Sequence, residues 1–164
     1  MIVTISTPEE MGELGAAIAR QLRAGDLIAL DGELGAGKTT FTRGLGEQLR
    51  VRGAVTSPTF VLARTHPRPD GPPLVHVDAY RLGSPAELDD LDIDFERSIV
   101  VVEWAAGMLD GVTEDWLALH ITRPRGAPAS ESSVTEDGVE PRIVEITPHG
   151  ERWSGVDLRG IKLA

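Results

Sequence analysis

The chain of 164 residues contains no cysteine and no asparagine. Without cysteine there is no disulfide framework, which is typical of a cytoplasmic protein. Without asparagine the guanine-reading motif N-K-x-D cannot occur, so a GTPase is disfavoured. The longest apolar runs, such as Ile99 to Val102, fall far below the ~18 residues of a membrane span. No basic region followed by an apolar block opens the chain, so we expect a soluble, cytoplasmic protein without a secretory signal or membrane contact.

Positive charge is also scarce. The chain has only two lysines, Lys38 and Lys162, against fourteen arginines, and its net charge is −10 with a pI of about 4.8. This charge repels the phosphates of a long nucleic acid, so we expect any RNA to be reached through a partner. The histidines lack the spacing of metal ligands, so no zinc site is expected. The length suits one α/β core and is short for two.

A glycine-rich stretch from Asp31 to Thr40 dominates what is present. It follows the apolar run Leu27 to Leu30 and leads into a helical pattern that ends near Arg50. The phosphate-loop pattern G-x-x-x-x-G-K-[S/T] is matched at Gly32, Gly37, Lys38 and Thr39. An ordinary glycine-rich turn is the alternative, but the strand before it and the helix after it favour a phosphate loop. No G-x-G-x-x-G occurs, so dinucleotide binding is not supported.

Each position of this loop has a chemical reason. Glycines let backbone N–H groups approach phosphate oxygens, and the start of the following helix adds its dipole. Lys38 can reach the β- and γ-phosphates, and the Thr39 hydroxyl can ligate Mg²⁺. The residues expected to bind ATP phosphates are Glu33, Leu34, Gly35, Ala36, Gly37, Lys38, Thr39 and Thr40.

Alternating and apolar patterns predict the other elements. A helix is expected to begin at Thr7 as N-cap, with Glu10 closing a capping box, and to end at Gly25. Ser84 to Glu87 repeats the capping-box pattern. Predicted strands are Ile2–Ser6, Leu27–Leu30, Phe60–Thr65, Leu74–Asp78, Ser98–Glu103, Trp116–Thr122 and Arg142–Ile146. We expect a mobile hairpin loop at Arg125 to Glu140, one domain over 1–147, and a tail over 148–164 that is at most partly ordered.

Two predicted strands end in a carboxylate, Asp78 and Glu103. Ligands of open α/β sheets bind at the carboxyl ends of strands, so one acid is expected to hold Mg²⁺ and the other to orient or deprotonate a water. The alternative is that either acid caps a helix or pairs with Arg81.

A threonine-rich loop, Val55 to Phe60, follows the predicted phosphate-loop helix. Its Ser57, Pro58 and Thr59 stand where other phosphate-loop proteins carry a segment that senses the γ-phosphate. Ser-Pro-Thr is also an ordinary turn.

An acidic stretch runs from Glu87 to Glu96, interleaved with apolar residues. Such runs are usually solvated faces, and the alternative is a docking surface for a basic partner.

Four segments together resemble one family. In this order and spacing, they are similar to TsaE (YjeE), small bacterial ATPases of tRNA threonylcarbamoyladenosine synthesis. The segments are Gly32–Thr40 (GELGAGKTT), Ser57–Phe60 (SPTF), His76–Arg81 (HVDAYR) and Glu103–Trp104 (EW). The phosphate loop is shared by many families, whereas S-P-T-F with D-x-Y-R and E-W is far more specific. The match runs from about Val3 to Ile146, and Ala79 departs from it, where a larger apolar residue is usual.

The resemblance implies a single-domain P-loop NTPase-like α/β fold with a mixed central sheet flanked by helices. It implies Mg-ATP binding, slow hydrolysis, and association with TsaD and TsaB, through which tRNA is reached; no metal other than Mg²⁺ is implied. Its implied site residues are Thr39 and Glu103 for Mg²⁺, Asp78 as catalytic acid/base, and Thr7, Trp104 and Arg142 near the nucleotide.

Two other functions stay open at this stage. A small-molecule kinase would need an acceptor pocket and an arginine-rich lid, and the sequence shows no such lid. A scaffold that binds ATP without hydrolysing it is disfavoured by the two acids. No arginine finger can be assigned, although Arg43 and Arg81 are candidates. The sequence leaves open which step hydrolysis would drive.

Overall fold

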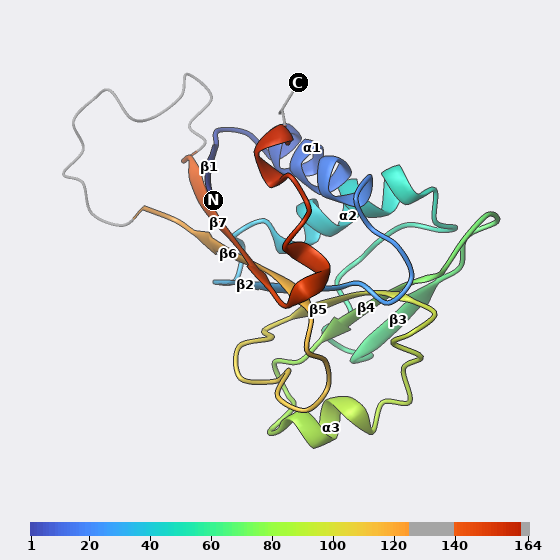
Figure 1. Ribbon diagram of the computed structural model, residues 1–164. Helices are drawn as coiled ribbons and strands as arrows, with labels where there is room; N and C mark the ends of the chain where they lie inside the picture. Colours follow the sequence, from blue (N-terminus) through green and yellow to red (C-terminus); the bar gives the residue numbers. More distant parts are fainter. Residues whose placement is uncertain (125–139, 162–164) are drawn as a thin grey trace.

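Seven strands form one mixed sheet in the part of the chain that the computed structural model describes, residues 1–124 and 140–161. The predicted hairpin loop therefore lies outside the described residues, except for Glu140. The elements are β1 (Ile2–Ile5), α1 (Pro8–Ala19), β2 (Leu27–Gly32), α2 (Lys38–Leu49), β3 (Ala63–His66), β4 (Leu74–Asp78), α3 (Pro85–Asp89), β5 (Ile99–Glu103), β6 (Trp116–Thr122) and β7 (Arg142–His149), followed by 3-10 turns η1 (Glu151–Trp153) and η2 (Leu158–Gly160) (Figure 1).

The strand order is β1-β7-β6-β2-β5-β4-β3. The four central strands β6, β2, β5 and β4 are parallel, while β7 and β3 pair antiparallel at the two sides and β1 pairs antiparallel with β7. The predicted mixed α/β sheet is confirmed. Because β2, β5 and β4 run in the same direction, their carboxyl ends meet at one edge of the sheet.

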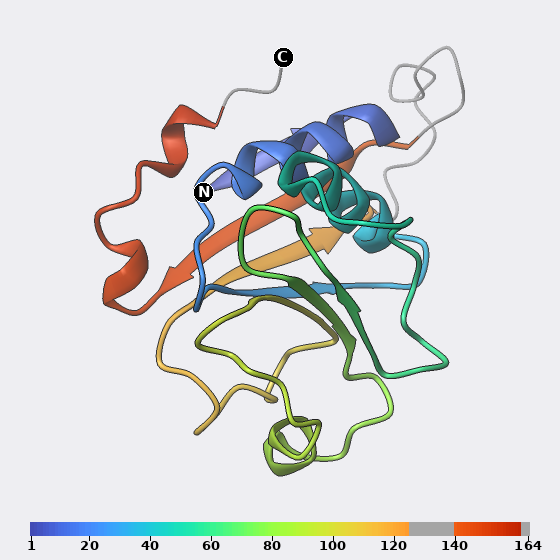
Figure 2. The same cartoon turned by 90° about the vertical axis from the view of Figure 1, so that its right-hand side faces the viewer.

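The two faces of the sheet bury different elements. α1 and α2 lie together over one face, and α3 lies on the other side of the sheet (Figure 2). Alternation within one strand produces this division: Ile28 and Leu30 of β2 enter the core under α1 and α2, whereas Leu27 and Ala29 face the α3 side. All five residues of β4 and of β5 are buried, as expected of strands covered on both faces.

Glycines bring the backbones of α1 and α2 into contact. A Cβ on Gly44 would lie 2.1 Å from the carbonyl oxygen of Gly12, and one on Gly15 would lie 2.2 Å from that of Phe41. Gly12 also lies at this crossing, but its own Cβ position is open, since a Cβ there would meet nothing within 4 Å. The helix that follows the glycine-rich loop is thus held directly against α1.

Two predicted boundaries and one predicted cap differ from the structure. α1 ends at Ala19 rather than Gly25, which lies in the later turn and donates its N–H to the Ser98 carbonyl. The strand expected from Phe60 begins only at Ala63, because Leu62 has a φ of 66° and breaks the extended backbone. The capping box at Ser84 forms only in part: the Glu87 carboxylate accepts a hydrogen bond from the Gly83 N–H, but the Ser84 side chain accepts no cap bond, and α3 has only five residues.

At α1 the predicted cap is confirmed. The Thr7 hydroxyl accepts a hydrogen bond from the Glu10 N–H at 3.1 Å. The Glu10 carboxylate in turn accepts from the Ser6 N–H at 2.5 Å, one residue before the expected partner.

The segment after β7 packs on the domain, which the sequence analysis missed. Trp153 is only 1% exposed. Arg152 makes two bonds of 2.8 Å to the carboxylate of Asp26, which is itself buried, and donates to the Gln21 carbonyl. A paired, buried carboxylate therefore ties this segment to the turn between α1 and β2.

The acidic residues from Glu87 to Glu96 are exposed, as a solvated face requires. Leu88 is buried, and the other apolar residues of this stretch pack against the α3-side core. Within the described ranges, no helix combines the length and apolar character needed to cross a bilayer.

We predict that Gly44→Ala destabilises the chain, because its new methyl group would overlap the Gly12 backbone. Forcing volume into such a contact costs ~1–3 kcal/mol or more. The measurement is the free energy of unfolding in urea.

Gly12→Ala is the matched control, since it adds the same group where the structure has open space. It should leave stability unchanged or raise it by up to ~1 kcal/mol through helix propensity. Equal losses in the two variants would contradict the close helix crossing.

Candidate functional site

The loop between β2 and α2 has the backbone geometry that is typical of anion-binding loops. Gly35 has a φ of 76° and Gly37 a φ of 114°, and both angles lie in the region that favours glycine. Gly37 is the N-cap of α2, so the unpaired N–H groups of the first turn face the same space as the loop. The predicted strand, loop and helix arrangement is confirmed.

Lys38 is buried at the centre of this loop, with 7% of its surface exposed. Its Nζ donates to the carbonyl of Gly32 at 2.7 Å and to that of Glu33 at 3.1 Å. Burial lowers the pKa of Lys38 below its ordinary value of 10.5, and the charges of Glu103, Asp78 and Asp31 oppose part of that shift. Desolvation of the ammonium is therefore the larger effect.

Asp78 and Glu103 lie at the same sheet edge because β4 and β5 pair in register, Asp78 opposite Glu103. Each is 3% exposed. The Asp78 Oδ1 accepts a bond of 2.9 Å from the Tyr80 N–H, and the Glu103 Oε1 lies 3.0 Å from the Nε2 of His76. Both acids line one cavity of about 220 Å³ together with Lys38 and Thr39.

Trp104 forms one wall of this cavity. Its φ of 58° is unusual for a bulky residue and marks a constrained turn directly after β5. The Lys38 ammonium lies 4.5 Å from the centre of the indole ring, and the Tyr80 ring meets the indole edge-on at 5.2 Å. The aromatic ring thus faces the same cation that the loop carbonyls hold.

A second cavity, of about 130 Å³, adjoins the first through shared loop residues. It is lined by Thr7 and Arg142, which are far apart in sequence, and by Met11 of α1. The sheet order explains this meeting, because β1 and β7 are paired neighbours. Thr7 and Arg142 therefore lie beside the glycine-rich loop, where the resemblance expects nucleotide contacts.

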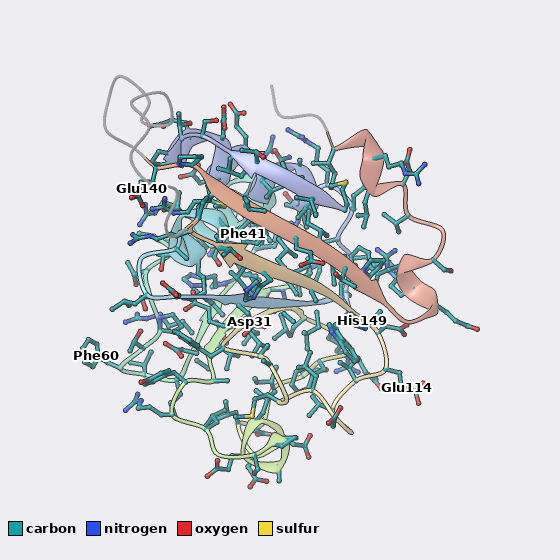
Figure 3. All side chains as sticks on the ribbon, turned by 90° about the vertical axis from the view of Figure 1, so that its left-hand side faces the viewer. Asp31, Phe41, Phe60, Glu114, Glu140 and His149 are labelled. Atoms are coloured by element: carbon teal, nitrogen blue, oxygen red, sulfur yellow. The ribbon has the colours of Figure 1, made fainter. Side chains whose placement is uncertain are left out.

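The Ser-Pro-Thr loop borders the first cavity. Ser57 and Thr59 line it, and their hydroxyl oxygens are 2.6 Å apart. The Thr59 carbonyl accepts a bond from Arg81 at 2.5 Å. Phe60 is 92% exposed and points away from the body of the molecule (Figure 3).

The predicted phosphate-binding residues do not all face one space. Leu34, Gly35, Gly37, Thr39 and Thr40 line the first cavity, and Ala36 lines the second. Glu33 instead borders a third cavity, between the loop and the end of β6. Pro58, between Ser57 and Thr59, is not a lining residue of these cavities.

The oxygen donors fit magnesium. Thr39 supplies a hydroxyl and Glu103 a carboxylate in the same cavity. Among the residues that the structure describes, no group of three or more His, Cys, Asp or Glu side chains could hold a metal. Mg²⁺ is commonly held by one or two protein oxygens together with substrate phosphates and water, and the Thr39 hydroxyl and Glu103 carboxylate are donors of this kind.

Sequence reasoning missed two side chains of this region. His76 contacts Glu103, and Arg123, just after β6, donates to the Gly35 carbonyl at 3.1 Å. The signal for His76 was present, as a polar residue inside an apolar strand. Arg123 carried no local signal, because only the pairing of β6 with β2 brings it to the loop.

Of the two arginines considered as arginine fingers, Arg81 contacts the Ser-Pro-Thr loop, while Arg43 borders a groove between α1 and α2.

Comparison with known proteins gives a consistent result. The family model "Threonylcarbamoyl adenosine biosynthesis protein TsaE" matches residues 5–129. The tRNA threonylcarbamoyladenosine biosynthesis protein TsaE of Streptomyces coelicolor is 57% identical over 152 residues, covering 90% of this chain and 97% of that protein. The protein of the same name from Mycobacterium tuberculosis strain H37Rv is 43% identical over 130 residues, covering 73% and 77%.

Among solved structures, the crystal structure of Bacillus subtilis YdiB superposes with a TM-score of 0.71 at 28% identity. The match covers 93% of this chain and 88% of that one. The predicted P-loop NTPase-like fold is confirmed.

We predict that Lys38→Met changes how stability depends on pH. A lysine with a lowered pKa in the folded state binds fewer protons folded than unfolded, so the wild type gains stability as pH rises toward 10.5. The variant lacks this gain. Urea unfolding of both proteins at neutral pH and at about pH 10 measures the difference, in which all shared titrating groups cancel. A wild-type advantage that stays constant or falls with pH would contradict the lowered pKa.

Proposed function

The chain belongs to the TsaE family of tRNA threonylcarbamoyladenosine biosynthesis proteins, and from this premise we propose that it binds and hydrolyses Mg-ATP as a component acting on a TsaD–TsaB complex. One observation carries the proposal: Lys38, Thr39, Asp78 and Glu103, from three separate elements, line a single cavity at the glycine-rich loop. The reaction class is phosphoanhydride hydrolysis, and tRNA is reached only through the partners.

Binding uses the two adjoining cavities. Loop N–H groups and Lys38 hold the phosphates in the first, where burial strengthens their attraction for charge. The second cavity, with Thr7 and Arg142, takes the nucleoside end. Because Gly35, Gly37 and Thr40 line both cavities, one nucleotide can occupy the two cavities at the same time.

Hydrolysis relies on positioning. Thr39 and Glu103 would hold Mg²⁺, and the ion would supply positive charge to the transferred phosphate. Asp78 orients the attacking water and accepts its proton. The Tyr80 N–H fixes Oδ1 of Asp78, while Oδ2 has no hydrogen bond among the described residues and is available to the water. Ser57 and Thr59 line the same cavity, and in this proposal they act as the segment that senses the γ-phosphate.

A small-molecule kinase and a non-hydrolysing scaffold are less well supported than an ATPase. A small-molecule kinase needs an acceptor site beside the γ-phosphate, and that side of the cavity is bordered by Asp78 and the Ser-Pro-Thr loop. A scaffold that binds ATP without hydrolysis has no need for a buried second acid, whereas Asp78 and Glu103 are both buried in one cavity.

The rim of the cavity favours a partner that covers it. Four large apolar side chains on the segments that supply the cavity lining are exposed: Leu34, a lining residue, at 89%, Phe60 and Val61 just after Thr59 at 92% and 49%, and Tyr80, which contacts Trp104, at 67%. Clustered exposed apolar groups commonly mark protein contacts. We propose that the TsaD–TsaB pair docks on this rim and stimulates slow basal hydrolysis, in preference to docking on the acidic stretch.

Lys38→Ala and Asp78→Ala should separate binding from chemistry. Lys38→Ala is expected to abolish both ATP binding and phosphate release, because the loop loses its ammonium. Asp78→Ala should retain ATP binding but slow phosphate release by ~10²–10⁴-fold, as loss of a general base does. Isothermal titration and phosphate release measure the two properties.

Asp70→Ala, which removes an exposed aspartate from a loop, is the control and should behave as wild type. Undiminished hydrolysis in both site variants would reject the site assignment.

Phe60→Ser should abolish stimulation by TsaD–TsaB while leaving basal phosphate release unchanged, because the exposed ring contacts the partner and not the nucleotide. Phosphate release is measured with and without the pair, and Glu103→Ala shows whether the stimulated activity belongs to this site.

Ile2→Ser changes an equally apolar, 69% exposed residue on β1 and should keep stimulation. Asp89→Lys with Asp90→Lys tests the acidic stretch. Loss of stimulation in that double variant, with Phe60→Ser unaffected, would move the docking surface to the acidic face.

A further inference from the structure

His76 is the one polar side chain among the first four residues of β4, Leu74 to Val77. It is 0% exposed. A polar ring in such a strand costs free energy unless it gains a hydrogen bond. That bond is the 3.0 Å contact between its Nε2 and Oε1 of Glu103.

The direction of this bond follows from chemistry. An ionised carboxylate only accepts hydrogen bonds, so Nε2 of His76 carries the hydrogen and donates. The Nδ1 atom is buried without a hydrogen-bond partner in the described part of the chain. In the neutral ring with its hydrogen on Nε2, Nδ1 is an unprotonated acceptor, so no buried N–H is left unpaired.

The bond fixes one half of the Glu103 carboxylate. Glu103 is 3% exposed, and among the described residues His76 is the only hydrogen-bond partner of its side chain. With Oε1 held by the ring, Oε2 is left for a ligand in the cavity that Glu103 lines with Thr39. His76 itself is not a lining residue of that cavity, so it does not touch the ligand.

We propose that His76 is a positioning residue, which orients Glu103 so that Oε2 binds Mg²⁺. This inference rests on the proposed function, because it gives Glu103 the metal-binding role. Partners that orient a metal ligand typically set metal affinity by ~10–100-fold. The competing explanation is that the pair only stabilises the fold. A positioning role predicts that removing the His76 donor weakens ATP binding only when Mg²⁺ is present. A purely structural role predicts the same loss of ATP affinity with and without Mg²⁺.

The test compares His76→Gln with His76→Met. These side chains have nearly the same length and volume, but only glutamine presents an N–H donor near the position of Nε2. ATP affinity is measured by titration calorimetry with excess Mg²⁺ and again with EDTA, and the ratio of the two affinities reports the metal contribution. The ratio should be near the wild-type value in the Gln variant and fall by ~10–100-fold in the Met variant. Affinity in EDTA should be the same in all three proteins.

Glu103→Gln provides the second arm. In this background the ratio should already be low, and adding His76→Met should reduce it no further, because His76 acts through Glu103. An independent further loss would overturn the proposal. So would an unchanged ratio in the Met variant, or an equal loss of affinity in EDTA and in Mg²⁺.

Folding is checked by thermal unfolding without metal. If His76→Met does not fold, His76→Asn takes its place, since its shorter side chain remains polar but withdraws the donor from Glu103. A wild-type protein without any Mg²⁺-dependent gain in ATP affinity would reject the proposed function and this role together. A clear wild-type gain that both His76 variants share would reject the role of His76 alone.

Discussion

The hydrogen-bonded register of three parallel strands is the constraint on which the candidate site depends. Leu30 of β2 is paired with Glu103 of β5, and Glu103 is paired with Asp78 of β4. These pairings bring the start of the glycine-rich loop and both acids to one level of one sheet edge. A slip of one residue in either pairing would turn a carboxylate toward the opposite face, because side chains alternate along a strand.

The charged side chains at that edge of the sheet balance one another, but their burial removes them from water. Lys38, Asp78 and Glu103 are all buried, and the lysine compensates with bonds to loop carbonyls and contact with the Trp104 ring. The lowered pKa of Lys38 shows that its environment favours the neutral amine more than water does. A site that binds a polyanion benefits from this arrangement, since an unscreened ammonium attracts phosphate strongly.

The site is supported from the helix side of the sheet as well. Glycines let α2 approach α1 closely, and Met11 of α1 lies 3.3 Å from the position that a Cβ on Gly37 would take. Thr7, at the start of α1, thereby faces the second cavity beside the same loop. The packing of two helices and the pairing of β1 with β7 thus set the distance between the two ends of the proposed nucleotide site.

The sequence by itself determined the loop, the two acids and most strands, because glycine spacing, apolar runs and alternation are local patterns. The order of motifs also identified the family. Tertiary structure decided what depends on contacts between distant segments: the meeting of Thr7 with Arg142, the approach of Arg123 to the loop, and the burial of Trp153. It also decided that His76 contacts Glu103, since residues on two strands become neighbours only through their pairing, which no local pattern encodes.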